Sequence, residues 1–149
     1  MKGNEKVLEN LNFLLADELT AINQYMVHSE MCADWGYEKL HEAIEERAIQ
    51  EMKHAEELIA RILFLEGSPT VSNLNKITIG QDVLSQHKND WDAERGAIRN
   101  YNEGVKLATE QGDNGTRVLL ESILKDEETH IDWLEAQLDQ IEQIGLERY

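Results

Sequence analysis

Four glutamates fall on the apolar faces of the helices that this chain can form, and two of them are followed three residues later by a histidine. These residues are Glu18, Glu51 with His54, Glu94, and Glu127 with His130. In each half of the chain, the first glutamate precedes the Glu-x-x-His pair by 33 positions. A buried carboxylate is costly unless a positive charge lies beside it. No lysine or arginine matches all these positions, so the pattern predicts a pair of metal ions as the partner.

The spacing explains how such residues could bind metal. A glutamate and a histidine three residues apart project from one helix face, so a carboxylate oxygen and an imidazole nitrogen can bind the same ion. Two such helices and one glutamate from each of two others supply four carboxylates and two neutral imidazoles. Two divalent cations would neutralise the four negative charges. This ligand set suits iron or manganese, zinc could bind without redox chemistry, and the arrangement is that of ferritin-like di-iron bundles.

Four amphipathic helices are expected to position these residues, since apolar side chains recur at steps of three and four. We expect the first at about residues 5–35 and the second at about 37–66, where Gly67 and Pro69 stop it. The third follows the cap Asp82 and ends in a turn at 112–115. The fourth runs from that turn to Gly145.

Residues 68–80 have no helical period and are too many for a tight turn. A connection of this length can run along a bundle and let the next helix start from the opposite end. The fold class is therefore all-α, a ferritin-like antiparallel four-helix bundle with one long crossover between helices two and three. We expect residues 1–149 to form a single domain, with the metal-binding residues of all four helices at one height.

Composition limits the function classes. Acidic residues outnumber basic ones by 30 to 14, a formal charge of −16, which argues against nucleic acid and favours cations. The start of the chain has no apolar signal core, and no run is long enough to span a membrane. Cys32 is the only cysteine, so no intramolecular disulfide can form. We therefore expect a cytoplasmic protein.

Longer segments resemble the bacterioferritins. They are Met1–Gly3, Leu19–Tyr25, Glu51–Glu56, Arg61–Gly67 and Asp126–Leu134. The resemblance implies a homo-oligomeric shell of twenty-four subunits, built from two-fold dimers, that stores ferric mineral. It also implies a ferroxidase, which oxidises ferrous iron with dioxygen or peroxide at a di-iron centre in each subunit, and a small ferredoxin as reductant. The resemblance further implies that Glu18 and Glu94 are terminal ligands, that Glu51 and Glu127 bridge the two ions, and that His54 and His130 each supply a nitrogen ligand.

Met52 is the residue that the resemblance links to haem. It lies about 100° around the helix from Glu51, since 3.6 residues make a turn. It thus belongs to a second apolar stripe, whose other members are Ala48, Ala55, Ile59 and Ile62. Such a helix is expected to pack in its own bundle and against another subunit. The resemblance implies that Met52 and its copy across the dimer two-fold bind the iron of a b-type haem, and a flexible core or interface methionine is the alternative.

Three further residues have open roles. Tyr25 lies two turns beyond Glu18 and could donate a hydrogen bond or an electron to the centre, or fill the core. Asp90 and Asp126 could orient the ligand histidines from behind, or could be solvated acids.

Two features depart from the bacterioferritin pattern. Positions 46 and 50 are often a histidine and an acid that bind iron at the inner surface, whereas this chain has Glu46 and Gln50. An inner-surface iron site therefore lacks its usual ligands. The chain also ends at Tyr149, where relatives commonly continue into a short helix lining the four-fold channels, so we expect more open channels.

Three functions are compatible with these residues, and an iron-storage ferroxidase is favoured. The second is a peroxide-scavenging di-iron oxidoreductase of the rubrerythrin kind, which typically adds a cysteine-rich electron-transfer module that Cys32 alone cannot build. The third is a haem-binding electron-transfer shell without ferroxidase turnover, and six intact ligand positions argue against it.

Overall fold

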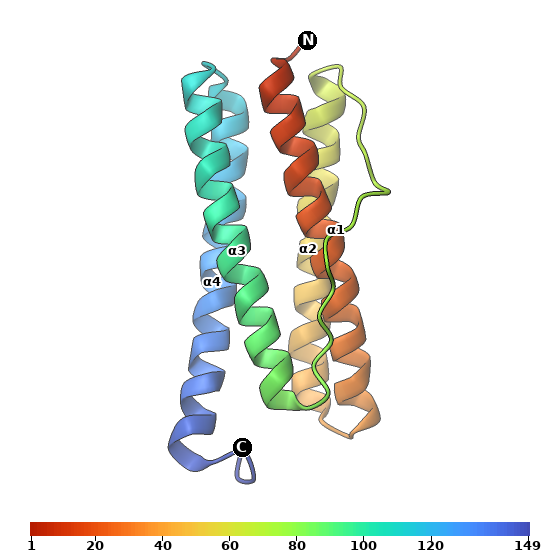
Figure 1. Cartoon of the computed structure of the whole chain (residues 1–149), viewed down its shortest axis with the longest axis vertical. Helices are drawn as coiled ribbons and strands as arrows, with labels where there is room; N and C mark the ends of the chain where they lie inside the picture. Colours follow the sequence, from red (N-terminus) through yellow and green to blue (C-terminus); the bar gives the residue numbers. More distant parts are fainter.

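The computed structural model describes residues 1–149 and is built from four long helices. They are α1 (Glu5–Asp34), α2 (Glu38–Phe64), α3 (Val83–Glu110) and α4 (Asn114–Ile144). α1 packs on α2 and on α3, and α4 packs on α3 and on α2, with each packed pair antiparallel (Figure 1). The predicted fold class is confirmed, including the crossover between α2 and α3. The observed ends of α1 and α2 lie within one or two residues of the expected ones.

Local sequence signals set the helix ends. The Asn4 side chain accepts hydrogen bonds from the Lys6 and Val7 N–H groups at the start of α1. Asp82 and Ser85 form a reciprocal capping box at the start of α3, and Asp113 accepts from the Thr116 N–H at the start of α4. These caps satisfy N–H groups that have no partner within the helix.

The core consists of two apolar clusters. The larger contains Leu11, Leu15, Leu58, Leu120 and other residues in the half of the bundle that holds the N-terminus. The smaller is formed by Tyr25, Cys32, Ile44 and Ala48 in the other half. Along α1, Glu18 lies between the residues of the two clusters. The polar residues of the expected metal centre therefore occupy a layer with apolar packing on both sides.

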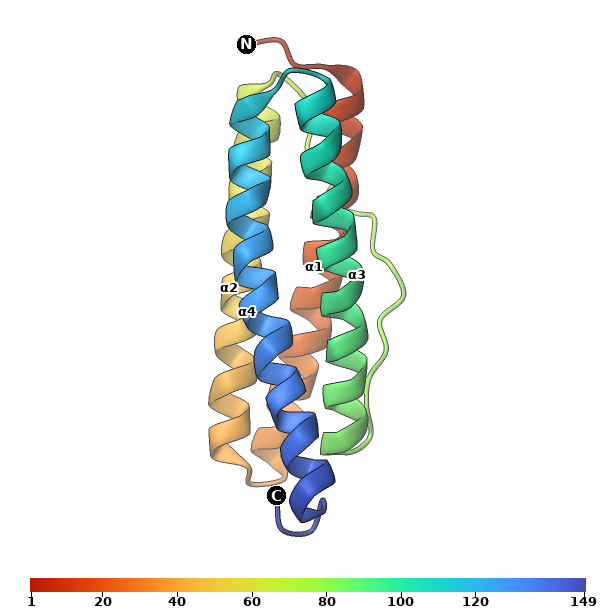
Figure 2. The same cartoon turned by 90° about the vertical axis from the view of Figure 1, so that its left-hand side faces the viewer.

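The crossover lies along α1 and α3 (Figure 2) and is held by polar side chains of α1. Four backbone N–H groups of the crossover donate to successive side chains of α1. These bonds are Thr70 to Asn12 (2.8 Å), Asn75 to Thr20 (2.8 Å), Thr78 to Gln24 (3.2 Å) and Gly80 to His28 (2.9 Å). Gly80 passes so close to α3 that a Cβ atom would lie 2.4 Å from the Gln86 backbone nitrogen, so only glycine fits.

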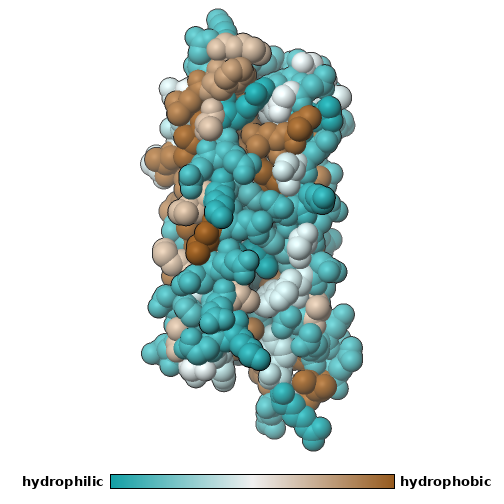
Figure 3. Space-filling model, turned by 180° about the vertical axis from the view of Figure 1, so that it is seen from behind, coloured by the Kyte–Doolittle hydropathy of each residue, from teal (hydrophilic) through white to brown (hydrophobic).

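The apolar face that α2 turns to solvent differs from the expected stripe. Ala48, Ala55 and Ile62 are buried in the core of the chain itself. The exposed apolar residues of α2 include Ile49, Met52 and Leu63. The expected register was wrong because these three residues lie on the same side of α2 as the buried Glu51, His54 and Leu58, which face the other helices. Seen from the face opposite to that of Figure 1, apolar surface gathers toward one side and the upper half of the molecule (Figure 3).

The packing of the larger cluster generates a stability prediction. Leu58 is fully buried, so Leu58→Ala should lower the free energy of unfolding by about 2–5 kcal/mol, through lost burial and the cavity left behind. Val118→Ala, at a position 56% exposed, should cost less than about 1 kcal/mol. Thermal unfolding of the metal-free proteins, followed by circular dichroism, compares them. Equal midpoints for the two variants would contradict the assignment of Leu58 to the core.

Candidate metal centre

The structure brings all six predicted site residues together in the middle of the bundle, one or two from each helix. Each is at most 2% exposed. His54 Nδ1 lies 3.0 Å from Glu127, 3.3 Å from Glu51 and 3.7 Å from Glu18. These distances join the imidazole of α2 to carboxylates of α1, α2 and α4.

The second histidine repeats this geometry. His130 Nδ1 lies 3.0 Å from Glu51, 3.6 Å from Glu94 and 3.7 Å from Glu127. The two imidazole rings are nearly parallel, with centroids 6.3 Å apart. Glu51 and Glu127 therefore contact both histidines, whereas Glu18 and Glu94 each lie on one side.

The six residues form two overlapping sets of possible metal ligands. One set is Glu18, Glu51, His54 and Glu127, and the other is Glu51, Glu94, Glu127 and His130. Within each set, the donor atoms lie within 4.8 Å of one another. Because two carboxylates belong to both sets, the geometry suits two adjacent ions bridged by Glu51 and Glu127.

The hydrogen-bond pattern tests whether metal fits this centre. Buried polar atoms in proteins almost always have a hydrogen-bond partner. Here six buried side-chain atoms have none, and five of them belong to the centre. They are one oxygen each of Glu18, Glu51, Glu94 and Glu127, and Nδ1 of His130. Unpartnered atoms that all point into one space are what a cluster of metal ligands requires.

Burial and mutual repulsion alter the acidity of the centre. Burial raises the pKa of Glu51 well above its ordinary value, and the charges of Glu18 and Glu127 raise it further. Burial and the charge of Glu127 do the same to the pKa of Glu94. Burial alone would lower the pKa of His54, but hydrogen bonds to Glu127 and Glu18 outweigh it and raise the pKa to about 11. Without metal, the centre therefore holds protons at neutral pH.

The outward nitrogen of each histidine has its own acceptor. His54 Nε2 lies 2.9 Å from Asp126 Oδ2, so Asp126 orients the His54 imidazole. This contact is one of the two roles that were expected for Asp126. His130 Nε2 donates to the Gln50 amide oxygen. Both contacts leave Nδ1 free to face the carboxylates. The contact of Gln50 was not foreseen, although Gln50 precedes Glu51 as Asp126 precedes Glu127.

Two tyrosines donate hydrogen bonds to Glu18 and Glu94, the carboxylates that each belong to only one ligand set. Tyr25 donates to Glu94, and Tyr101 donates to Glu18, each at 2.5 Å. Tyr25 therefore provides the hydrogen bond that was one of its expected roles. Tyr101 was missed, although it follows Glu94 by seven residues as Tyr25 follows Glu18. Each tyrosine thus fixes the glutamate that belongs to the other half of the chain.

Both roles that were expected for Asp90 are wrong. It is only 2% exposed, so it is not a solvated acid, and it contacts neither ligand histidine. It accepts from Gln24 Nε2 and from His28 Nδ1, each at 2.9 Å. His28 Nε2 accepts from the Gly80 N–H, which places the imidazole proton on Nδ1. Asp90 and His28 therefore anchor the crossover rather than the metal ligands.

A polar pocket leads from the outer surface to the centre. It has a volume of about 200 Å³ and reaches Glu18, Glu51 and Glu94. Near Glu18, Asp17 accepts hydrogen bonds from Asn75 (2.6 Å) and Asn100 (2.7 Å). The crossover and α3 therefore meet over α1 at this pocket, whose lining also includes Lys76.

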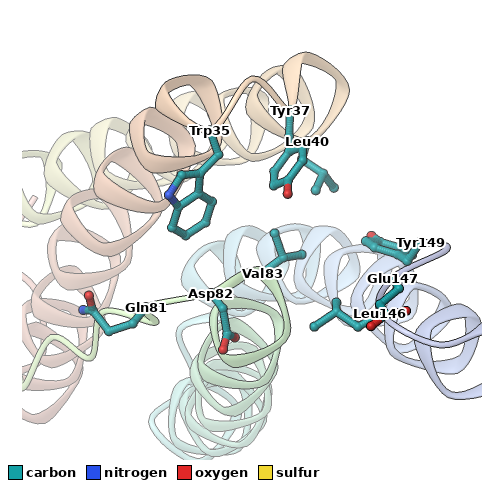
Figure 4. Close-up of a pocket in the computed structure, with 9 residues that line it drawn as sticks. All are labelled: Trp35, Tyr37, Leu40, Gln81, Asp82, Val83, Leu146, Glu147 and Tyr149. Carbon is teal, nitrogen blue, oxygen red and sulfur yellow. The ribbon is translucent and has the colours of Figure 1, made fainter.

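A larger pocket, of about 390 Å³, lies at the end of the bundle where α1 turns into α2 (Figure 4). Its lining includes Trp35, Tyr37, Val83 and Tyr149. None of the six site residues lines it. It is thus separate from the metal centre.

Comparison with known proteins identifies the family. The ferritin-like domain model matches residues 8–144. Bacterioferritin from Brucella melitensis is 43% identical over the whole of this chain and 92% of its own length. Bacterioferritins from Rhodobacter capsulatus and Mycobacterium leprae are 41% and 40% identical, over 97% and 100% of this chain and 90% and 94% of their own lengths. This chain belongs to the bacterioferritin family.

Membership of this family indicates what the buried cluster of carboxylates and histidines does. Family membership and the two overlapping sets of carboxylate and histidine ligands together support iron storage with a di-iron centre. No helix of the chain has both the length and the apolar character that crossing a membrane requires.

The protons held by the centre generate a prediction. Binding of two zinc ions per subunit near pH 7 should release protons, because the ions displace them from Glu51, Glu94 and His54, and affinity should rise with pH. Calorimetric titrations in two buffers of different ionisation enthalpy measure the release. The Glu51→Gln/Glu127→Gln variant, which lacks both bridging carboxylates, corrects for surface binding. Identical enthalpies in both buffers would show that the centre does not hold these protons.

Proposed function

We propose that this chain is a ferroxidase, which oxidises two ferrous ions at the centre described above and passes ferric iron to a storage cavity. The observation that carries the proposal is the pair of overlapping ligand sets that share Glu51 and Glu127. Ferrous iron is the substrate and supplies the electrons, which dioxygen or hydrogen peroxide accepts. The protein contributes geometry and charge.

Each site residue has a role in this proposal. Glu18 and Glu94 are terminal ligands, and Glu51 and Glu127 bridge the two ions. His54 and His130 each give one ion a nitrogen ligand through Nδ1, the atom that faces the carboxylates. Burial and mutual repulsion raise the pKa of Glu51 and of Glu94, and four carboxylates match the charge of two divalent ions, so binding these ions removes the repulsion.

The surroundings of the centre support binding and release of iron. The polar pocket beside Asp17 gives ferrous ions a route from outside. The net charge of −16 attracts cations to the surface. By analogy with the family, we infer one domain over residues 1–149, a cytoplasmic shell of twenty-four copies assembled from two-fold dimers, and a small ferredoxin that returns electrons for iron release.

Haem binding is a second part of the proposal and depends on Met52. Its side chain is 46% exposed on the outer surface of α2, one turn from Ile49, which is 44% exposed. A thioether on an apolar surface suits an axial haem ligand once a second copy of the chain covers that surface. We propose that Met52 and its copy hold the iron of a b-type haem, which would carry electrons toward the stored mineral.

Removal of a ligand tests the ferroxidase. Glu94→Ala and Glu127→Ala should each abolish rapid ferrous oxidation, because each removes a proposed ligand, and should leave the fold intact, because the apolar clusters on both sides of the centre are unchanged. Stopped-flow oxidation at two ferrous ions per subunit provides the measurement. Glu128→Ala, an exposed acid next to Glu127, is the matched control and should keep the wild-type rate. Wild-type rates in both ligand variants would refute the proposed reaction.

Haem ligation has its own test. Met52→Leu keeps the volume and apolar character, so its effect on stability should stay below about 1.5 kcal/mol, while the thioether is lost. We expect no haem absorbance, normal ferrous oxidation and slower reductive iron release. Met26→Leu, at a methionine of α1 that is 51% exposed, serves as the control and should retain haem. A full haem complement with an unchanged spectrum in Met52→Leu would mean that another residue binds the haem iron.

A further inference from the structure

The predicted ligands and their hydrogen-bond partners repeat between the two halves of the chain, and one pair of partners differs in type. The residues that surround the ions recur at an offset of 76 positions: Glu18 and Glu94, Tyr25 and Tyr101, Glu51 and Glu127, His54 and His130. The residues that accept from the outward nitrogens of the histidines follow the same offset, but they differ in type. Position 50 is glutamine, whereas position 126 is aspartate.

The contacts cross between the halves. Asp126 of α4 accepts from His54 of α2, with 2.9 Å between Oδ2 and Nε2. Gln50 of α2 accepts from His130 of α4 through its amide oxygen. One ligand histidine is therefore backed by a negative charge and the other by a neutral dipole. Each partner lies directly behind the imidazole, so no other group intervenes.

This difference changes how strongly each histidine donates to a metal ion. A carboxylate behind an imidazole draws the Nε2 proton toward itself and makes Nδ1 a stronger electron donor than a neutral amide does. Partners of this kind typically change metal affinity by about 10–100-fold. The side chain of Asp126 is 41% exposed, so solvent screens its charge and the lower end of that range applies.

We propose that the two metal positions of the centre are unequal and fill in a fixed order. The first divalent ion binds between Glu18 and His54, the position backed by the Asp126 carboxylate, and the second binds between Glu94 and His130, the position backed by the Gln50 amide. Gln50 and Asp126 act as positioning residues that set the order. This inference rests on the proposed metal centre but requires no ferroxidase turnover.

Titration of the metal-free assembled protein with cobalt(II) tests the order, since the visible spectrum of cobalt reports its ligands. The wild-type protein should bind two ions per subunit in two steps, with dissociation constants about tenfold or more apart. Gln50→Asp should tighten the second step and bring the two constants together. Asp126→Asn should weaken the first step and also reduce the ratio. Glu42→Gln removes an exposed acid of α2 and should leave the ratio unchanged, which separates a local effect from net charge.

A crystal structure with one cobalt ion per subunit identifies the position that fills first. Anomalous scattering should lie beside His54. Equal constants in the wild-type protein, a ratio that Gln50→Asp does not change, or a first ion beside His130 would overturn the inference and leave the proposed function standing. Failure to bind two buried ions per subunit at all would instead overturn the proposed function.

Discussion

The burial of four carboxylates in the middle of an apolar bundle is the constraint on which the rest of the structure depends. In the ligand set around His54, three carboxylates have oxygens within 4.8 Å of one another. At an effective dielectric constant of about 20, two such charges repel by roughly 3–4 kcal/mol. Three pairs give on the order of 10 kcal/mol, as much as the whole stability of a typical domain. The centre must therefore hold protons or bind cations. Two divalent cations neutralise the charge of all four carboxylates.

Other parts of the fold hold these carboxylates in place against their repulsion. Apolar clusters close the layer from both sides, so the helices cannot separate locally without exposing core residues. Tyr25 and Tyr101 each tie a glutamate to the opposite half of the chain. The side chains of α1 that hold the crossover keep one wall of the polar pocket in position. The result is a preorganised set of ligands, which need little rearrangement when ions bind.

The sequence was sufficient to predict the four helices and the long crossover, because apolar spacing and the breakers Gly67 and Pro69 are local signals. The meeting of the four glutamates and two histidines in the middle of the bundle was also predictable, because a charged residue on an apolar face conflicts with its surroundings and so stands out. Asp126 was foreseen only as one of two alternatives. These predictions needed only the spacing of apolar residues along each single helix, and did not require knowing which helices are neighbours.

The remaining features depend on contacts between helices, which the period of one helix does not encode. Tyr101 and Gln50 act on residues of the other half, so their roles follow from packing. Asp90 is buried because the crossover brings the Gly80 N–H to His28. The outward face of α2 was misplaced for a similar reason. Ala48 and Met52 are both apolar, and only the approach of the neighbouring helices decides that the alanine is covered and the methionine is exposed.

X-ray absorption spectroscopy of protein loaded anaerobically with two ferrous ions per subunit would show whether the buried residues bind iron, because it measures the surroundings of the iron itself. We expect an iron–iron distance of about 3.5–4 Å, as in other two-metal sites, and on average one imidazole nitrogen per iron among carboxylate oxygens. A spectrum without iron–iron scattering, and with oxygen ligands alone, would place the iron on the acidic surface and contradict the claim that the buried carboxylates and histidines form a dinuclear centre.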